Sequence, residues 1–496
     1  MDVPDRLPYE VLDALYGDTG PPISRHHQPR HAFLVISSKR SGTFRPLVRF
    51  RATDLILYQA LVDRLAPDIE GALAPRDRVG AYRQDLTGNV DAFAGTMSND
   101  EFRHAIRQHV QAHPAAFVLE TDISGYFLSI RLPQLQETLL DCSDRPDAVH
   151  DLINLLSEWQ NLGVRGLPQG IRPSSPLGNL YLASLDRLLA RHSLASYRWM
   201  DDMWILCDSY SAARRVQDLT ERHLYGLGLT LNGEKTRILR SSTAAGRLET
   251  PALRFEERRE EAVEDLVEIL EGQDYLDPAD IPDDEEIDRS VTIADHDRLT
   301  ATLGDDVLPG EFSAEMGLVY RQLTKLRDAH GLPSISRVLI RSPHLSTVAL
   351  RYAAEMGPIA TKAVVAVFAD VLARVEYTRD FEKLNLCHKA VDLKRDPKSN
   401  LGDLMGELAL RDEHPLIRAK ALIAWGVHSA DDQFDVFDRF IRTADPQWRV
   451  YALVSIQRKA AQQRDERFDA WAHTGETTLA KLVDQLRKKP IRWSHL

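Results

Sequence analysis

Residues 117–130 read FVLETDISGYFLSI, and residues 196–206 read SYRWMDDMWIL. In the first stretch an apolar run that is typical of a strand ends at Asp122, and in the second Asp201 and Asp202 stand together between strand-forming residues. Adjacent acidic groups inside an apolar hairpin are unfavourable unless a turn or a cation compensates their charge. Each stretch alone is also typical of an ordinary turn. Together the two stretches predict carboxylates from separate elements that can bind divalent metal.

Ordered elements surround these two stretches. Between them lies RGLPQGIRPSSPLGNLYLASLD (165–186), where two glycines free the backbone for close approach, an amide can contact a ligand, and a helix is expected from Asn179. After them comes LGLTLNGEKTRIL (227–239), with Lys235 following an Asn-Gly turn. Upstream lies the basic segment KRSGTFRPLVRF (39–50).

In this order the elements resemble motifs A, B, C and D of prokaryotic reverse transcriptases, the group that includes group II intron, retron and abortive-infection enzymes. The resemblance covers about residues 25–240. It implies an RNA-directed DNA polymerase that uses two Mg²⁺ ions, with Mn²⁺ as an alternative. The implied metal ligands are Asp122, the backbone carbonyl of Ile123, Asp201 and Asp202.

The same resemblance implies where the nucleotide binds. Basic residues of the fingers hold the triphosphate, an aromatic side chain excludes a 2′-hydroxyl, a glutamine seats the nucleotide, and a lysine lies near the leaving pyrophosphate. The matching residues are, in that order, Lys39 (with Arg40 as an alternate) and Arg45, Phe127, Gln169, and Lys235.

Some positions depart from the family pattern. Trp199 stands where a tyrosine is usual, Pro176 comes one place late in motif B, and RSSTAAGR replaces a recognisable primer-grip motif after Leu239. These departures indicate unconventional template or primer handling. A tyrosine such as Tyr275 or Tyr451 is then a candidate covalent primer.

Three regions differ in pattern and predict an α+β fold of polymerase palm and fingers followed by an all-α, HEAT-like helical domain. We expect fingers and palm over 1–245, an acidic linker or connecting helices over 246–320, and helical repeats in place of a thumb over 321–496. Within the middle region we expect a helix near 253–270 and a loop around DPADIPDDEEID (277–288). The helical repeat depends on P-x-x-R-x-x-A-L at 415–422, which recurs at 446–453. An irregular bundle that happens to repeat this string is the alternative, and either arrangement would bury Trp425 and Trp448.

The net charge of −12 does not exclude a nucleic-acid enzyme, because the charge is localised. Residues 251–320 hold 22 acidic and 5 basic side chains, or −17, which leaves the remainder at +5. Residues 25–65 hold eight Lys or Arg against two Asp. Exposed charges farther apart than about 10 Å are screened, so a local basic surface can still bind phosphates.

Composition limits the cellular setting and the partners. No apolar run reaches the length of a membrane-spanning helix, the N-terminus lacks a signal-peptide pattern, and the three cysteines form no CxxC pair. We therefore expect a cytoplasmic protein without a membrane partner. Expected partners are dNTPs and RNA or single-stranded DNA, with a non-coding RNA, a second copy of the chain or a companion defence protein as further candidates.

A reverse-transcriptase region followed by helical repeats is similar to the abortive-infection and defence-associated enzymes of bacteria, which implies an antiphage role. The alternatives are a retron-like enzyme acting with a structured non-coding RNA, and a catalytically idle RNA-binding scaffold. The intact trio of aspartates disfavours an idle scaffold, because three buried like charges are unfavourable without metal. An RNA polymerase is a further alternative, and Phe127 disfavours it.

Overall fold

A computed structural model describes residues 29, 32–39, 43–86, 97–271, 282–374, 379–457, 459–472 and 486 of the chain. The chain folds into two compact units. The first, here called the sheet unit, comprises Leu47–Leu253 and Asp2–Leu34. The second, here called the helical unit, comprises Val35–Pro46 and Arg254–Leu496, together with Met1.

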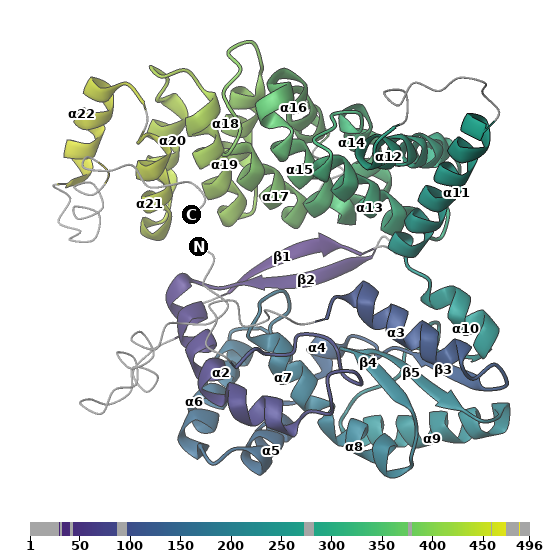
Figure 1. Cartoon of the computed structure of the whole chain (residues 1–496). Helices are drawn as coiled ribbons and strands as arrows, with labels where there is room; N and C mark the ends of the chain where they lie inside the picture. The colour runs from purple at the N-terminus through teal and green to yellow at the C-terminus, as the bar shows by residue number, and fades with distance from the viewer. Residues whose placement is uncertain are drawn as a thin grey trace. The chain divides into compact units, whose positions relative to one another are not determined.

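A four-stranded antiparallel sheet with the strand order β4-β5-β3-β6 organises the sheet unit (Figure 1). In that order its strands are β4 (Ser196–Trp199), β5 (Asp202–Cys207), β3 (Phe117–Thr121) and β6 (Arg237–Arg240). In the central pair Phe117 lies opposite Cys207 and Thr121 lies opposite Met203. The two apolar runs at 117–121 and 202–207 form strands β3 and β5, as predicted. Their apolar residues on both faces fit a sheet that helices cover on both sides.

Helices cover the two faces of this sheet with separate cores. On one face Val118 and Trp204 pack with Phe102 of α3 (Asn99–Gln111) and Leu248 of α10 (Ser241–Leu248). On the other face alternate strand residues such as Ile205 join a larger core formed by the remaining helices. These are α2 (Ala52–Ala72), α4 (Tyr126–Ser129), α5 (Leu132–Cys142), α6 (Pro146–Asn161), α7 (Ser174–Tyr181), α8 (Ala183–Arg191) and α9 (Tyr210–Gly226).

The helix expected from Asn179 begins earlier than predicted. Pro173 precedes helix α7, which starts at Ser174, so Asn179 lies in the helix interior and is fully buried. The early start follows from Ser174–Pro176, a small-residue turn that can begin a helix with the proline in its first turn.

The helical unit consists of short helices in two rows (Figure 1). Each helix of one row packs on the next helix of the same row, as α13 does on α15, α15 on α17, α17 on α19 and α19 on α21. The bounds are α11 (Pro251–Glu271, which enters from the sheet unit), α12 (Asp284–Ala301), η3 (Thr302–Gly304), α13 (Phe312–Lys325), η4 (Leu332–Ser334), α14 (Ile335–Arg341), η5 (Pro343–Leu345), α15 (Ser346–Glu355), α16 (Gly357–Ala373), α17 (Asp380–Ala390), α18 (Leu401–Arg411), α19 (Pro415–His428), α20 (Asp435–Thr443), α21 (Pro446–Ser455) and α22 (Ala461–Ala472).

The repeated string P-x-x-R-x-x-A-L marks the starts of two neighbouring helices of one row. Pro415 is the first residue of α19 and Pro446 is the first residue of α21. Between these helices Gly426 permits a close approach, because a Cβ atom there would lie 1.9 Å from the carbonyl oxygen of Ser455. The expectation that Trp425 and Trp448 are core residues is confirmed by exposures of 2% and 7%.

The loop expected over 277–288 is wrong for its last part, because α12 begins at Asp284. Asp283 accepts a hydrogen bond from the Glu286 N–H, and the Glu286 side chain accepts one from the Asp283 N–H. This capping box satisfies helix-end donors, and carboxylates in the first turn also suit the positive end of the helix dipole. Arg259 of α11 pairs with Asp284 and Asp288, which offsets part of the acidic run.

A β-hairpin of β1 (Phe33–Ser38) and β2 (Phe44–Arg49) carries the basic segment. On β1, the N–H groups of Ile36 and Ser38 donate to the carboxylates of Asp380 and Glu382, each at 3.2 Å. This part of the hairpin therefore belongs with α17 in the helical unit. Among the described helices, none is both long and apolar enough to cross a membrane.

Candidate active site

Asp122 lies where β3 ends, and a later loop holds it there. The main chain of residues 230–232 runs beside it, with Ile123 opposite Leu231 and the Asn232 N–H donating to the Asp122 carbonyl at 2.7 Å. The Asn232 amide donates to Asp122 Oδ2 at 3.1 Å, and Lys235 Nζ lies 3.0 Å from the same oxygen. The carboxylate is 6% exposed. The lysine and the first aspartate that the sequence singled out are therefore in direct contact.

The tandem aspartates form part of a tight hairpin turn. Trp199 pairs with Asp202 across β4 and β5, so Met200 and Asp201 are the two turn residues. Met200 has a φ of +56°, in the left-handed region that costs a residue with a side chain about 1–2 kcal/mol. Because β5 is the neighbour of β3 in the sheet, this turn lies at the same end of the sheet as Asp122. The turn thus places Asp201 and Asp202 at the end of the sheet where β3 leads into Asp122.

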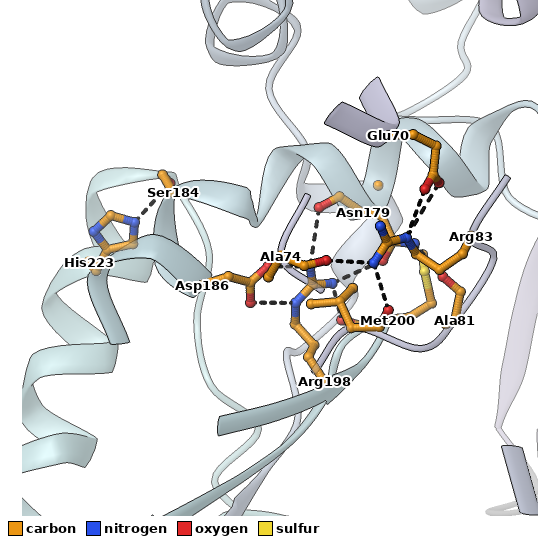
Figure 2. Close-up of polar contacts among 12 residues, drawn as sticks. Glu70, Ala74, Ala81, Arg83, Asn179, Ser184, Asp186, Arg198, Met200 and His223 are labelled. Carbon is orange, nitrogen blue, oxygen red and sulfur yellow. Dashed lines mark hydrogen bonds and ion pairs between the residues drawn. The ribbon is translucent and has the colours of Figure 1, made fainter. Parts of the chain in front are cut away.

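A buried arginine holds the hairpin turn. Arg198, 2% exposed, donates through Nη1 to the Met200 carbonyl and to the Asn179 side-chain oxygen, each at 3.0 Å. Its Nε and Nη2 donate to the two oxygens of Asp186 at 2.9 and 2.6 Å. Figure 2 shows these partners gathered around the guanidinium group. The network ties the turn to helices α7 and α8, and each of its polar groups would be unfavourable if left unpaired.

The three carboxylates repel one another. Burial, followed by the charges of Asp201 and Asp122, raises the pKa of Asp202 to about 7, although Lys235 and Arg103 oppose the shift. Partial burial lowers the pKa of Lys235, but its hydrogen bond to Asp122 and the charges of the three aspartates outweigh that effect and raise it. The donors are all oxygens, which Mg²⁺ and Mn²⁺ prefer. A cation would relieve the repulsion, so the donor set fits divalent metal.

Three elements of the site meet at Gly178 of α7. A Cβ atom at Gly178 would lie 3.1 Å from Met200 Cε and 3.3 Å from Phe127 Cε1. Its carbonyl accepts a hydrogen bond from the Tyr126 hydroxyl, and the Tyr126 and Phe127 rings are 5.5 Å apart. The half-buried Phe127 is therefore packed beside the turn that carries the tandem aspartates.

Glycines of the segment before α7 allow equally close approach. Gly166 has a φ of +58°, and a Cβ there would lie 2.1 Å from the Phe127 carbonyl oxygen. Gly170 has a φ of +87° and lies against Leu47 of β2. Between them, the Gln169 carbonyl accepts a hydrogen bond from the Val48 N–H at 3.0 Å. The backbone position of Gln169 is thus set by β2.

Other candidate residues have different surroundings. Lys39 and Arg45 are exposed on the β1–β2 hairpin, in the segment that belongs to the helical unit. Arg40 and Tyr275 lie outside the described residues. Tyr451, the other candidate primer, is half-buried against Trp448, and burial raises its pKa. A phenol with a raised pKa is a weaker nucleophile, so Tyr451 is a poor candidate for priming.

Sequence reasoning missed three residues that shape the site. Asn232 lies in the Asn-Gly turn with no assigned role, Arg198 lies in the strand before the tandem aspartates with no assigned role, and Arg103 comes from α3. Arg103 lies over the Trp204 ring at 5.8 Å; burial lowers its pKa, and the charge of Asp202 opposes that shift. A charged residue in the apolar run of 196–206 was the one available signal for Arg198, because such a residue needs a partner when it is buried.

Known proteins resemble parts of this chain. Residues 37–261 match the family described as reverse transcriptase (RNA-dependent DNA polymerase). A curated relative, the retron Mx65 reverse transcriptase of Myxococcus xanthus, is 28% identical over 144 residues, which is 26% of this chain and 34% of that protein. The match thus spans about a third of the relative's length.

Two solved telomerase structures align over larger parts of the chain but less closely. One, from Candida albicans with a fragment of telomeric RNA, covers 72% of this chain and 68% of that one at 12% identity and a TM-score of 0.31. The other, an apo telomerase from Candida tropicalis, covers 74% of this chain and 71% of that one at 9% identity and a TM-score of 0.33. Similarity at this level does not bear on function.

Proposed function

We propose that the reverse-transcriptase domain carried by residues 37–261 synthesises DNA with Asp122, Asp201 and Asp202 as its metal-binding carboxylates. This domain is an RNA-directed DNA polymerase domain, and its reaction requires a nucleic-acid template and dNTPs. The observation that supports the assignment of the aspartates is their convergence at one end of the sheet, with the pKa of Asp202 raised to about 7.

The family uses divalent metal, and the carboxylate cluster offers the ligands for it. Asp122, Asp201, Asp202 and the Ile123 carbonyl would hold the Mg²⁺ ions, with Asp122 and Asp201 as the main ligands and Asp202 as the weaker one. When bound, the ions neutralise charge on the phosphates and activate the attacking hydroxyl. The contribution of the chain is to hold the carboxylates in place, through the strained Met200 turn and the Asn232 amide on Asp122.

The remaining residues have roles in holding the nucleotide. The Phe127 ring lies against Gly178, and the Gly166 segment packs on the Phe127 backbone, so these contacts support the ring in the position proposed to exclude a 2′-hydroxyl. Lys235 supplies positive charge beside the carboxylates. By resemblance, Lys39 and Arg45 contact the triphosphate, and Gln169 contacts the nucleotide. Ribonucleotide incorporation at the same rate as dNTP incorporation would contradict the role of Phe127.

The assignment is tested by incorporation of labelled dNTPs with purified Asp201→Asn protein. Loss of a metal ligand worth several kcal/mol should lower the rate by about 10²–10³-fold or more. Asp208→Asn is the matched control, because Asp208 is an exposed aspartate that follows the other end of β5. Full activity of Asp201→Asn, or equal loss in both variants, would overturn the assignment.

The cellular role proposed here is antiphage defence, with the HEAT-like helical unit acting in place of a thumb. The support is the resemblance to abortive-infection enzymes and the two-row helical packing that follows the polymerase domain. Plating efficiency of phage on cells with and without the gene tests the role, and Asp201→Asn should abolish protection. Equal plating on wild-type and mutant cells would contradict it.

A retron-like function is the second candidate, and the match to a retron reverse transcriptase favours it. It requires one dominant structured RNA bound to the protein. Sequencing of co-purified nucleic acid separates the two candidates, because a defence enzyme with unconventional priming does not require such an RNA. A bound RNA together with an Asp201→Asn variant of unchanged biological activity would instead support the idle scaffold.

A further inference from the structure

Two histidines and an aspartate come together in the helical unit, far along the chain from the catalytic carboxylates. His296 and Asp297 are neighbours on α12, and His330 lies in the loop between α13 and η4. Asp297 Oδ1 is 3.0 Å from His296 Nδ1 and 2.7 Å from His330 Nε2. The three ligand atoms all lie within 4.8 Å of one another. One carboxylate oxygen is thus shared by two imidazole nitrogens.

The hydrogen bonds of Ser334 define which nitrogen of His296 carries a proton. The Ser334 hydroxyl donates to the Gly331 carbonyl at 2.8 Å. Its one proton is then used, so it accepts from the Tyr320 hydroxyl at 3.2 Å and from His296 Nε2–H at 2.9 Å. In a neutral ring His296 Nδ1 is therefore unprotonated, and its lone pair faces the carboxylate of Asp297.

A lone pair that faces a carboxylate oxygen at 3.0 Å is unfavourable unless a cation lies between them. A proton on His296 is the first candidate, but the side chain is only 6% exposed. A metal ion is the other cation that satisfies Nδ1, and Asp297 Oδ1 and His330 Nε2 supply two more ligand atoms within 4.8 Å of it.

The loop that carries His330 is held in place without metal. The Tyr352 hydroxyl donates to the Asp328 carbonyl at 2.7 Å and accepts from the Gly331 N–H at 3.0 Å. The His330 N–H donates to Asp328 Oδ1 at 2.9 Å. Tyr352 is buried and stacks on Tyr320 with ring centroids 5.3 Å apart. The third ligand is therefore presented from a rigid support, as a binding site requires.

We propose that His296 Nδ1, Asp297 Oδ1 and His330 Nε2 bind one Zn²⁺ ion, with solvent as its fourth ligand. Two imidazoles and a carboxylate suit Zn²⁺, whereas Mg²⁺ prefers oxygen ligands alone. The second nitrogen of His296 donates to Ser334, an outer contact typical of zinc-bound histidines. The open side is provided by Asp297 and His330, whose side chains are 59% and 35% exposed. The ion ties α12 to the loop after α13.

The contacts to Asp297 Oδ1 need only small changes to fit a tetrahedral site. In a tetrahedral site with metal–ligand bonds of roughly 2.0–2.1 Å, ligand atoms lie about 3.3 Å apart. The two contacts to Asp297 Oδ1, at 3.0 and 2.7 Å, must therefore lengthen by a few tenths of an ångström. Exposed Asp297 can move this far by rotation of its side chain.

The test measures zinc bound by the purified full chain after treatment with a chelator. Titration with Zn²⁺ in excess Mg²⁺, followed by calorimetry and metal analysis, should give one Zn²⁺ per chain. Co²⁺ as a probe should give the strong visible absorption of a tetrahedral site. His330→Gln should lose the ion, and Ser334→Ala should bind it about 10- to 100-fold more weakly.

Controls separate this site from the catalytic carboxylates and from misfolding. Asp201→Asn should retain the ion, because that residue lies in the sheet unit, and His388→Gln should retain it as a matched histidine change on α17. Circular dichroism verifies the fold, and Asp297→Asn replaces His330→Gln if that variant does not fold. No zinc on the wild type, or undiminished zinc on both ligand variants, would overturn the proposal.

Discussion

Replacing Arg198 with methionine should destabilise the sheet unit more than any surface ion-pair change. The substitution removes the five N–H donors of a guanidinium that is 2% exposed and leaves Asp186, 7% exposed, without its bidentate partner. Breaking a buried ion pair by removing one partner costs about 3–5 kcal/mol. The Met200 carbonyl also loses its donor, so the turn carrying Asp201 loosens.

Hydrogen exchange of the β5 amides measures this loss within the intact chain. When exchange follows opening equilibria, about 3–5 kcal/mol corresponds to a roughly 10²- to 10⁴-fold faster exchange, since each 1.36 kcal/mol is tenfold. The double variant with Asp186→Leu should recover much of the stability, because an apolar pair of similar volume replaces a buried ion pair at little cost. Incorporation of dNTPs should recover less, since the Met200 carbonyl still lacks its donor.

The control is Arg222→Met, which breaks the exposed pair between Arg222 and Asp218 on α9. Their side chains are 79% and 62% exposed, so we expect a loss of less than about 1 kcal/mol. Equal β5 exchange in Arg198→Met and Arg222→Met would refute the reasoning. An Arg198→Met/Asp186→Leu variant no more stable than Arg198→Met would refute the role of the stranded carboxylate.

Further variants test the packing of the site and the helical unit. In a urea titration, Gly166→Ala should lower the free energy of unfolding by about 2 kcal/mol or more, because the alanine would have a left-handed backbone and its Cβ would clash with Phe127. Gly163 has a φ of +97° and no neighbour within 4 Å, so Gly163→Ala should lower it only by the cost of the left-handed backbone. Below pH about 6.5 the helical unit should lose up to about 1.4 kcal/mol per pH unit through His428, whose pKa is lowered chiefly by burial and also by Arg395. Stability falls as the pH is lowered because the unfolded chain takes up a proton that the folded His428 ring, hydrogen-bonded to the Ala390 carbonyl, does not. Unfolding midpoints that decrease as steeply on acidification in His428→Gln as in the wild type would contradict this prediction.

Much of the polymerase domain could be predicted locally. An apolar run on both sides of a tandem aspartate predicts a buried hairpin with the aspartates in its turn. Burying the two charges within the strands would cost free energy, whereas a turn at the end of the sheet leaves them accessible to solvent or a cation. The structure places Trp199 opposite Asp202, as a two-residue turn requires. Asp122 followed β3 for the same reason. The order of the motifs, rather than any one of them, made the resemblance specific.

The errors came where local patterns compete. The acidic run 277–288 has the composition of a loop, yet Asp283 and Glu286 form a capping box that starts α12. The helix at Asn179 began earlier, because small residues before Pro176 form its first turn. In both cases the start of a helix was decided by a few specific residues at its end, a capping box for α12 and a small-residue first turn for α7, which overall composition represents poorly.

The residue order was enough to predict the three aspartates as candidate metal ligands and to predict the strands beside them, because strands and turns depend on neighbours within a few positions and the order of the motifs is read along the chain. Only the tertiary structure joined Asp122 to Asn232, 110 residues later, and enclosed Arg198 between Asp186 and the Met200 turn. It also brought His330 to His296 and Asp297. Such contacts depend on how helices and strands pack over long separations, and no local pattern records which distant side chain will satisfy a buried charge.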